Sequence, residues 1–253
     1  MYFDTHAHYD DERFNEDRDE LLQTMAAAGI SLILNAASSL ESSKIALSLA
    51  DKYPFIYASV GVHPHDAKDM TDNTAAELEK LLLHEKAKAV GEIGLDYHYD
   101  HSPRDIQRAR FREQLELARH AKKPVIIHER EALPDMLDII KDFTDLNGVV
   151  HCFSGSWETA KIILKMGWNL SFTGVVTYKN ARKSREVVEN IPSDRYMLET
   201  DCPYLSPEPV RGRRNSSLNL PHIAEFVAMV RGVSVEEVAA TSMENGKKFF
   251  GII

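Results

Sequence analysis

The sequence has little cysteine, no long apolar run and no excess of positive charge. Its two cysteines, Cys152 and Cys202, cannot build a disulfide framework, and free thiols suit a reducing cytosol. No apolar run approaches the roughly 20 residues that cross a bilayer. The first six residues also lack the basic region and apolar stretch of a secretory signal. We therefore expect a cytoplasmic protein without a membrane partner.

The charge balance excludes one class of nucleic-acid-binding protein. The 253 residues include 30 basic and 39 acidic side chains, a formal net charge of −9. Such a chain does not coat nucleic acid through bulk positive charge, although an enzyme with a small cationic patch remains open. No Pro-, Gly- or Ser-rich linker and no charge block interrupts the sequence. We therefore predict one domain over residues 1–253.

Short apolar runs alternate with amphipathic stretches along the whole chain, at about 32 residues per pair, the length of a βα repeat. This alternation predicts an α/β fold: a single (β/α)8 TIM-type barrel with parallel strands and an outer ring of helices. An open doubly wound sheet is the alternative, but the glycine fingerprint of its dinucleotide-binding form is absent after the first strand. The predicted strands are 2–4, 30–35, 55–61, 89–93, 124–127, 148–151, 169–172 and 196–199. The predicted helices are 16–28, 42–52, 73–86, 104–122, 132–143, 157–165, 182–190, 221–230 and 235–250.

Histidines and carboxylates gather where the predicted strands end, and six of the eleven histidines lie there. In a barrel these ends meet at one rim, where active sites are built. His6 and His8 are two apart in an extended segment, so both rings project to the same side and suit one ion. Glu92 ends an apolar strand, where a carboxylate is costly unless it is paired or bound to metal. Hydrogen-bonded core histidines, a salt bridge and a helix cap are the ordinary alternatives.

The donors exceed what one tetrahedral ion uses, so we predict two divalent ions, with Mg, Mn, Zn or a similar metal compatible with the donor mix. A carboxylate can bridge two ions, and each ion then keeps an open position for water. Two such ions serve hydrolysis by a metal-activated water. The predicted ligands are His6, His8 and Asp201 on one ion, His128 and His151 on the other, and Glu92 as the bridge.

Seven segments carry a family resemblance: DTHAH (4–8), GVHPH (61–65), GEIGLDY (91–97), PVIIH (124–128), HCFSG (151–155), ETDCPYL (199–205) and RGRRN (211–215). In this order they resemble the TatD family of metal-dependent hydrolases, the TatD-related DNases among the amidohydrolase-like barrels. The resemblance implies a TIM-type barrel with a divalent, often dinuclear centre, and all six predicted ligands fall on family ligand positions. It also implies cleavage of phosphodiesters, usually in DNA, and sometimes 3′-to-5′ trimming.

Two departures from the family pattern avoid the predicted ligands. Glu129 stands where small hydroxyl residues are common, and Ser216 and Ser217 follow Asn215 where an acidic residue and proline are frequent. Both changes bear on substrate preference.

The predicted catalytic residues are Asp201, Glu92 and His63. Asp201 both binds metal and accepts the proton of the attacking water. Glu92 bridges the ions. His63 donates to a phosphate oxygen or to the leaving group, and its alternative is a packing role near the ligands.

The predicted substrate contacts are His65, Arg130, Arg211 and Arg213. Arg130 follows His128 by two residues and could form a fork to phosphate, with an ion pair to a neighbouring glutamate as its alternative. The Arg-Gly-Arg-Arg loop could hold a few phosphates of a chain end. The expected partner is therefore nucleic acid, DNA ends or single strands.

Two other functions remain open at this point. A dinuclear barrel could hydrolyse an amide, a lactone or an ester, including an aminoacyl ester on RNA. Dinuclear versions of that kind often use a modified lysine on the fourth strand, where this chain has Glu92. A non-catalytic binding protein with one structural ion is the third reading, and the expected open metal positions argue against it.

Overall fold

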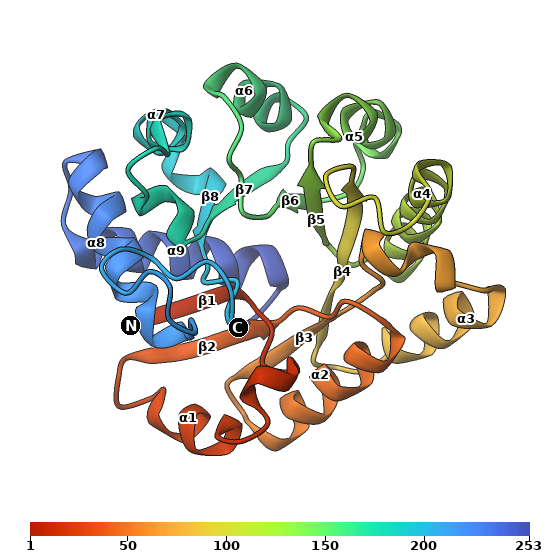
Figure 1. The fold of residues 1–253 in the computed structure, drawn as a ribbon, viewed down its shortest axis with the longest axis horizontal. Coiled ribbons are helices and arrows are strands. Elements are labelled where there is room, and N and C mark those ends of the chain that lie inside the picture. Colours follow the sequence, from red (N-terminus) through yellow and green to blue (C-terminus); the bar gives the residue numbers. More distant parts are fainter. The chain divides into compact units, whose positions relative to one another are not determined.

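The computed structural model describes all 253 residues. Eight strands alternate with α-helices and form one sheet in the order of the chain, β1 to β8 (Figure 1). None of the helices combines the length and the apolar character needed to span a membrane. The strands are β1 (Tyr2–Ala7), β2 (Ile30–Asn35), β3 (Ile56–Val60), β4 (Ala87–Asp96), β5 (Val125–Arg130), β6 (Gly148–Val150), β7 (Asn169–Phe172) and β8 (Tyr196–Leu198). The helices are α1 (Arg18–Thr24), α2 (Leu40–Lys52), α3 (Asp72–Leu81), α4 (Arg104–Ala121), α5 (Leu133–Ile140), α6 (Trp157–Lys165), α7 (Arg182–Asn190), α8 (Leu220–Arg231) and α9 (Val235–Phe250).

The parallel strand order confirms the predicted (β/α)8 fold class. Strands 30–35 and 169–172 and helices 157–165, 182–190 and 235–250 have the predicted bounds. Two other strands run past the predicted ends and thereby include His6 and His128, and the strand of Glu92 extends three residues further than predicted, to Asp96. The polar side chains interrupt the apolar pattern, but backbone pairing continues beyond them.

Two compact units make up the chain. The first unit comprises residues 1–35, 152–165 and 169–253, and the second comprises residues 36–151 and 166–168. The first therefore contains β1, β2, β7 and β8, and the second contains β3 to β6. The predicted single domain over 1–253 stays a prediction.

In the first unit, α9 packs against β1 and β8. A Cβ atom at Gly246 of α9 would lie 2.7 Å from the ring of Phe3, so only glycine permits this approach. Ser242 accepts a hydrogen bond from the backbone N–H of Leu198, at the end of β8 (2.8 Å). Beyond β8, Ala7 forms a parallel bridge with Cys202, which ties the segment after β8 to the end of β1.

In the second unit, two buried glutamines of α4 bind the segments that follow strands. Gln114 accepts from the backbone N–H of Val62 and donates to its carbonyl oxygen (2.8 and 3.0 Å). Gln107 does the same for Asp96, at 2.8 and 3.0 Å. Because each amide side chain satisfies both backbone groups of one residue, α4 fixes the ends of β3 and β4 against itself.

Gly94 is required by the close approach of β4 to β5. The two strands pair at Gly94 and His128 after a register shift between Val90 and Ile93. Gly94 has a φ of 142°, and a Cβ atom there would overlap the carbonyl oxygen of His128. Glycine therefore permits the pairing that carries His128 into its place.

We predict that Gly94→Ala destabilises the protein by about 3 kcal/mol or more, through the overlap and the unfavourable φ together. Gly232→Ala is the matched control, since Gly232 also has a positive φ, 68°, but a Cβ atom added there would have no neighbour within 4 Å. It should cost only about 1 kcal/mol. Equal losses in urea unfolding would show that the contact with His128 contributes nothing.

Candidate metal centre

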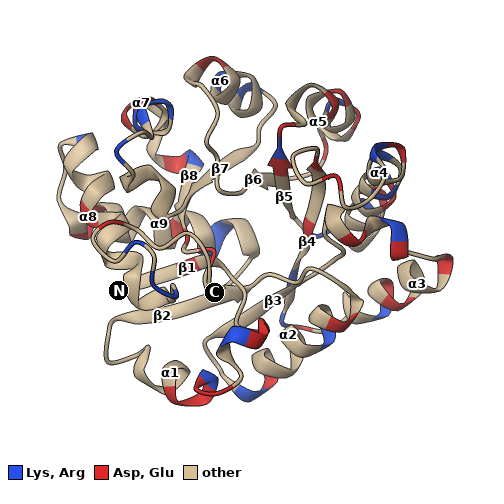
Figure 2. Ribbon diagram, viewed as in Figure 1, with Lys and Arg blue, Asp and Glu red and all other residues tan.

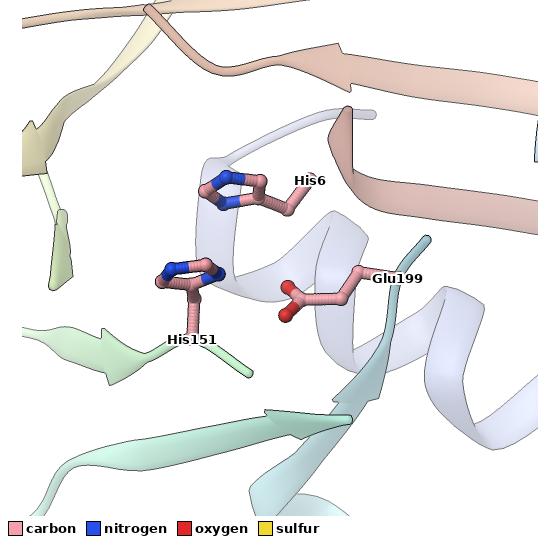
Figure 3. A group of neighbouring side chains, drawn as sticks. All are labelled: His6, His151 and Glu199. Atoms are coloured by element: carbon pink, nitrogen blue, oxygen red, sulfur yellow. The ribbon is translucent and has the colours of Figure 1, made fainter. Parts of the chain in front are cut away.

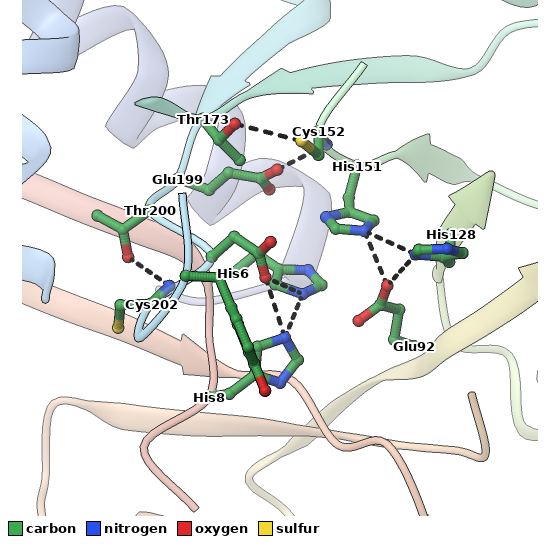
Figure 4. Close-up of polar contacts among 12 residues, drawn as sticks. His6, His8, Glu92, His128, His151, Cys152, Thr173, Glu199, Thr200 and Cys202 are labelled. Atoms are coloured by element: carbon green, nitrogen blue, oxygen red, sulfur yellow. Dashed lines mark hydrogen bonds and ion pairs between the residues drawn. The ribbon is translucent and has the colours of Figure 1, made fainter. Parts of the chain in front are cut away.

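Three predicted ligands of the first unit converge. His6 Nε2 lies 3.1 Å from His8 Nε2, and His8 Nε2 lies 3.1 Å from Asp201 Oδ1 (Figure 4). His6 Nε2 is 3.7 Å from the same oxygen. His6 and His8 come from β1 and the residue after it, whereas Asp201 follows β8. Two imidazole nitrogens and one carboxylate oxygen therefore form a triangle from residues almost 200 positions apart.

The backbone holds this triangle in place. The N–H of Asp201 donates to the carbonyl oxygen of His6 (2.9 Å), and the N–H of His8 donates to that of Cys202 (2.7 Å). Asp201 itself has a φ of 56°, in the left-handed region, which aspartate tolerates better than most residues. With this backbone turn, the Asp201 carboxylate faces the rings of His6 and His8. The alternation of side chains along a strand does not predict such a turn.

Below the triangle, Asp4 ties β1 to the segment after β8. Its carboxylate accepts hydrogen bonds from Thr200 Oγ1 (2.5 Å), Ser217 Oγ (2.6 Å) and the backbone N–H of Thr200 (2.9 Å). Burial raises the pKa of Asp4 to about 7 and outweighs the hydrogen bonds that Ser217 and Thr200 donate. These three bonds tie β1 to two places in the segment after β8, close in sequence to His6 and Asp201.

Glu199 is a buried carboxylate to which we gave no role from the sequence. One of its oxygens accepts from the N–H of Cys152 (2.7 Å), and a carboxylate oxygen lies within 4.8 Å of a ring nitrogen of His6 (Figure 3). The sequence signal that could have found Glu199 is the one used for Glu92, an acid at the end of an apolar strand.

Cys202 is buried and Cys152 half-buried, with Cys152 Sγ 3.2 Å from Thr173 Oγ1.

The second unit brings together the other three predicted ligands. Glu92 Oε1 lies 2.8 Å from His151 Nε2 and 2.9 Å from His128 Nδ1. The two ring nitrogens are 3.5 Å apart (Figure 4). Glu92 lies in β4, His128 in β5, and His151 directly after β6, so three neighbouring strands each supply one donor.

Asp96 orients two histidines at once. Its Oδ2 atom lies 3.0 Å from His128 Nε2 and 3.0 Å from His65 Nε2. Burial disfavours the charge of Asp96, but the hydrogen bonds from His128 and His65 outweigh burial and hold its pKa well below the usual value. Burial likewise opposes protonation of His128, while Asp96 and Glu92 raise its pKa. With Nε2–H donated to Asp96, neutral His128 keeps the lone pair of Nδ1 for a cation, which would also neutralise the facing oxygen of Glu92.

His63 has a defined tautomer. Its Nδ1 atom accepts a hydrogen bond from the backbone N–H of His65 (3.2 Å), so the ring proton of the neutral form lies on Nε2. That Nε2 is 3.6 Å from Glu92 Oε1, and His63, Glu92 and His128 offer ligand atoms within 4.8 Å of one another. His63 can therefore donate a hydrogen bond beside the predicted ligands, although its role stays a prediction.

Both triangles have the dimensions of a cation site. Around an ion with bonds of about 2.1 Å, neighbouring ligand atoms lie roughly 3.0 Å apart in an octahedron and roughly 3.4 Å apart in a tetrahedron. The separations of 3.1, 3.1 and 3.7 Å in one unit and of 2.8, 2.9 and 3.5 Å in the other fall around these values. The mixed nitrogen and oxygen donors also suit a divalent metal.

Comparison with known proteins identifies the family. A family model described as TatD related DNase matches residues 3–251. The chain belongs to the TatD-related DNase family. It is 43% identical to the metal-dependent hydrolase YabD of Bacillus subtilis over 100% of both chains. It is also 35% identical to the 3′-5′ ssDNA/RNA exonuclease TatD of a Rahnella strain, over 95% of this chain and 94% of that protein.

Solved structures of the TatD family have the same fold. The TatD homologue YJJV of Escherichia coli K12 matches with a TM-score of 0.93 and 30% identity, over 100% of this chain and 98% of that one. The family predicted from the sequence is therefore confirmed, and with it the enzyme class, a metal-dependent hydrolase.

The predicted substrate contacts of this TatD-family chain have different surroundings. The guanidinium of Arg130 lies 4.7 Å above the ring of Tyr99 and makes no ion pair, so the ion pair with a neighbouring glutamate is not formed. Arg211 lies 4.1 Å above the ring of Tyr178 and 3.6 Å from Glu208. Arg213 is exposed.

We predict that Asp96→Asn weakens metal binding about 10- to 100-fold. The asparagine amide would donate to His128 Nε2 and thereby move the ring proton to Nδ1, the atom that faces Glu92. Calorimetric titration of the metal-free protein with Mn²⁺ measures the loss.

Asp100→Asn is the control, because Asp100 is exposed and contacts Arg104 rather than a predicted ligand. Unchanged Mn²⁺ affinity in Asp96→Asn, with an unchanged melting temperature, would rule out this orienting role.

Proposed function

We propose that this TatD-family hydrolase cleaves phosphodiester bonds of DNA and trims single strands from the 3′ end. The observation that carries the proposal is the pair of histidine–carboxylate triangles, one in each unit. The name of the Rahnella relative, a 3′-5′ ssDNA/RNA exonuclease, supports the substrate class and the polarity.

The proposal includes two divalent ions per chain, Mg, Mn, Zn or similar. His6, His8 and Asp201 would hold one, and Glu92, His128 and His151 the other. That Glu92 also reaches the first ion stays a prediction. When bound, the ions would polarise a phosphodiester and lower the pKa of water.

Asp201 is the proton acceptor in this proposal. Its side chain is 14% exposed, whereas His6 beside it is fully buried. His8 is exposed to a similar extent, 12%, so water can reach the triangle at Asp201 and His8. An ionised Asp201 oxygen can accept a proton there while its backbone stays fixed by His6.

His63 is the proposed donor. The backbone N–H of His65 occupies its Nδ1 atom, so the neutral ring carries its proton on Nε2, directed at the carboxylate of Glu92. A phosphate oxygen or a leaving oxygen at that place would accept the hydrogen bond. Neutral imidazole suffices for this, since the tautomer already positions the proton.

We expect the purified protein to shorten a 5′-labelled single-stranded DNA in Mg²⁺ or Mn²⁺, and to leave a copy with a protected 3′ end intact. A chelator should abolish cleavage. A ladder that shrinks from the 3′ end, and only on the unprotected strand, checks the polarity. Asp201→Asn should reduce kcat at least about 100-fold, because asparagine cannot accept the proton.

Asp194→Asn is the matched control, because Asp194 is an exposed carboxylate near Arg195 in the same unit. Hydrolysis of amide, lactone or aminoacyl ester panels, with DNA left intact, would overturn the nuclease proposal in favour of the other dinuclear hydrolase.

Positive charge in the first unit is local. Figure 2 shows lysine and arginine at α7, and Arg211, Arg213 and Arg214 are exposed in the loop after β8. Arg214 is engaged by Asp17, at 2.5 and 2.8 Å. Arg211 has a looser pair, 3.6 Å from Glu208, and Arg213 has no ion pair, so these two are the members of this loop that we propose as phosphate contacts.

We predict that Arg211→Ala with Arg213→Ala raises KM for DNA roughly 3- to 10-fold and lowers the salt dependence of KM by about one unit of slope per lost contact. Arg112→Ala is the control, since this exposed arginine pairs with Asp142 on the surface of the second unit. A double variant whose KM and salt slope equal those of the wild-type protein would remove the loop from substrate binding.

A further inference from the structure

An exposed pair of rings follows β4 in the second unit. Tyr99 and His101 lie in the segment between β4 and α4, and their rings are parallel, at an interplanar angle of 9° and 5.5 Å between centroids. The Tyr99 side chain is 50% exposed and its hydroxyl makes no hydrogen bond. Burial does not account for this pair, because both rings face water.

The other large exposed aromatic residue is differently placed. Tyr204 donates its hydroxyl to Asp11 (2.8 Å) and has the guanidinium of Arg13 4.1 Å above its ring. Its exposed surface is therefore part of a local ion and hydrogen-bond cluster. Tyr99 also has an arginine over its ring, Arg130, but this arginine has no carboxylate partner. An arginine without an ion pair beside an exposed ring can contact a phosphate while the ring contacts a base.

The ring pair is continuous with the predicted ligands of the second unit. His65 contacts Tyr99 and His101 edge to face, with centroids 5.4 and 4.7 Å away. The same His65 ring lies 4.3 Å from that of His63. A chain of packed rings thus leads from the proposed proton donor to the exposed pair.

One carboxylate holds both His65 and the backbone of the exposed pair. Asp96 Oδ2 binds His65 and His128, while its Oδ1 accepts from the backbone N–H groups of His98 (3.0 Å) and Tyr99 (2.9 Å). The backbone that carries Tyr99 is therefore held by the residue that orients a predicted metal ligand. A flat group stacked on Tyr99 or His101 would lie at a fixed place relative to His128.

We propose that Tyr99, His101 and Arg130 form a nucleotide subsite, in which the rings stack on an unpaired base and Arg130 contacts its phosphate. The proposal rests on the nuclease function and deepens it, since it assigns the place of the nucleotide next to the bond that is cut. Stacking requires a base whose face is free, so the subsite selects single strands or frayed ends. It tolerates all four bases, because each has a π-face.

The test pairs a protein change with a substrate change. Tyr99→Ala should raise KM for a single-stranded oligonucleotide roughly 5- to 100-fold, with kcat changed less, and Tyr99→Trp should restore it. An abasic nucleotide next to the cleaved bond should raise the KM of the wild-type protein by the same factor. It should not raise the KM of Tyr99→Ala further, because the ring that stacks on the base is already missing.

A spectroscopic measurement separates stacking from a general loss of activity. An oligonucleotide with 2-aminopurine at that position should lose fluorescence on binding to Asp201→Asn, and the loss should disappear in Asp201→Asn with Tyr99→Ala. Leu83→Ala, a change at an exposed apolar residue of the same unit, is the control and should alter neither KM nor quenching.

The outcomes separate the two proposals. The subsite is overturned if the wild-type protein cleaves and Tyr99→Ala has the same KM. It is also overturned if the abasic position raises KM by the same factor in Tyr99→Ala as in the wild-type protein. Either result leaves the nuclease function standing. Absence of cleavage of every oligonucleotide by the wild-type protein would overturn both.

Discussion

The site depends on the burial of carboxylates against imidazoles. Glu92 and Asp96 are almost inaccessible to water, and a buried negative charge is stable only when hydrogen bonds or positive charge surround it. In the second unit that surrounding consists of His63, His65, His128 and His151. The electrostatics therefore demand a positive partner at the place where a divalent ion would bind. The same cluster that would be costly in an ordinary core is a suitable ligand set here.

The backbone around these carboxylates is held by several independent contacts. Gln107 occupies both backbone groups of Asp96, and Gly94 permits β4 to approach β5 next to it. In the first unit, Asp4 binds Thr200 and Ser217 next to the triangle of His6, His8 and Asp201. Side chains that a metal requires within a few tenths of an ångström are thus held by contacts that do not involve the metal.

The fold class could be predicted from the sequence because the pattern that indicates it is repeated along the chain. Eight apolar runs at regular spacing indicate a parallel α/β order, and errors of a few residues at strand ends do not change that order. The six residues predicted as ligands stand out in the sequence because histidine and acid side chains follow apolar runs. In contrast, Asp96 and Glu199 have no role in the sequence prediction, although each also follows an apolar run. A hydrogen bond to His65 or to the N–H of Cys152 depends on the folded geometry rather than on the residue pattern.

The surroundings of the arginines also lay beyond the sequence. Arg130 was expected beside phosphate or a glutamate, and its contact with Tyr99 depends on how the segment after β4 turns back toward β5. That turn is set by hydrogen bonds to a single aspartate, which no periodicity reveals. The left-handed backbone at Asp201 belongs to the same class of local detail.

The segment after β4 is anchored at its two ends and exposed between them. Asp96 and Ser102 are fully buried, and Ser102 Oγ donates to the carbonyl oxygen of His65 (2.7 Å), whereas residues 98–101 face water. Asp96 holds the backbone of His98 and Tyr99, but the side chains between the two borders are exposed, so they can be exchanged without removing these anchors. Protein engineers could graft other sequences between these borders and alter which polymers the enzyme accepts, while the histidines beneath keep their geometry.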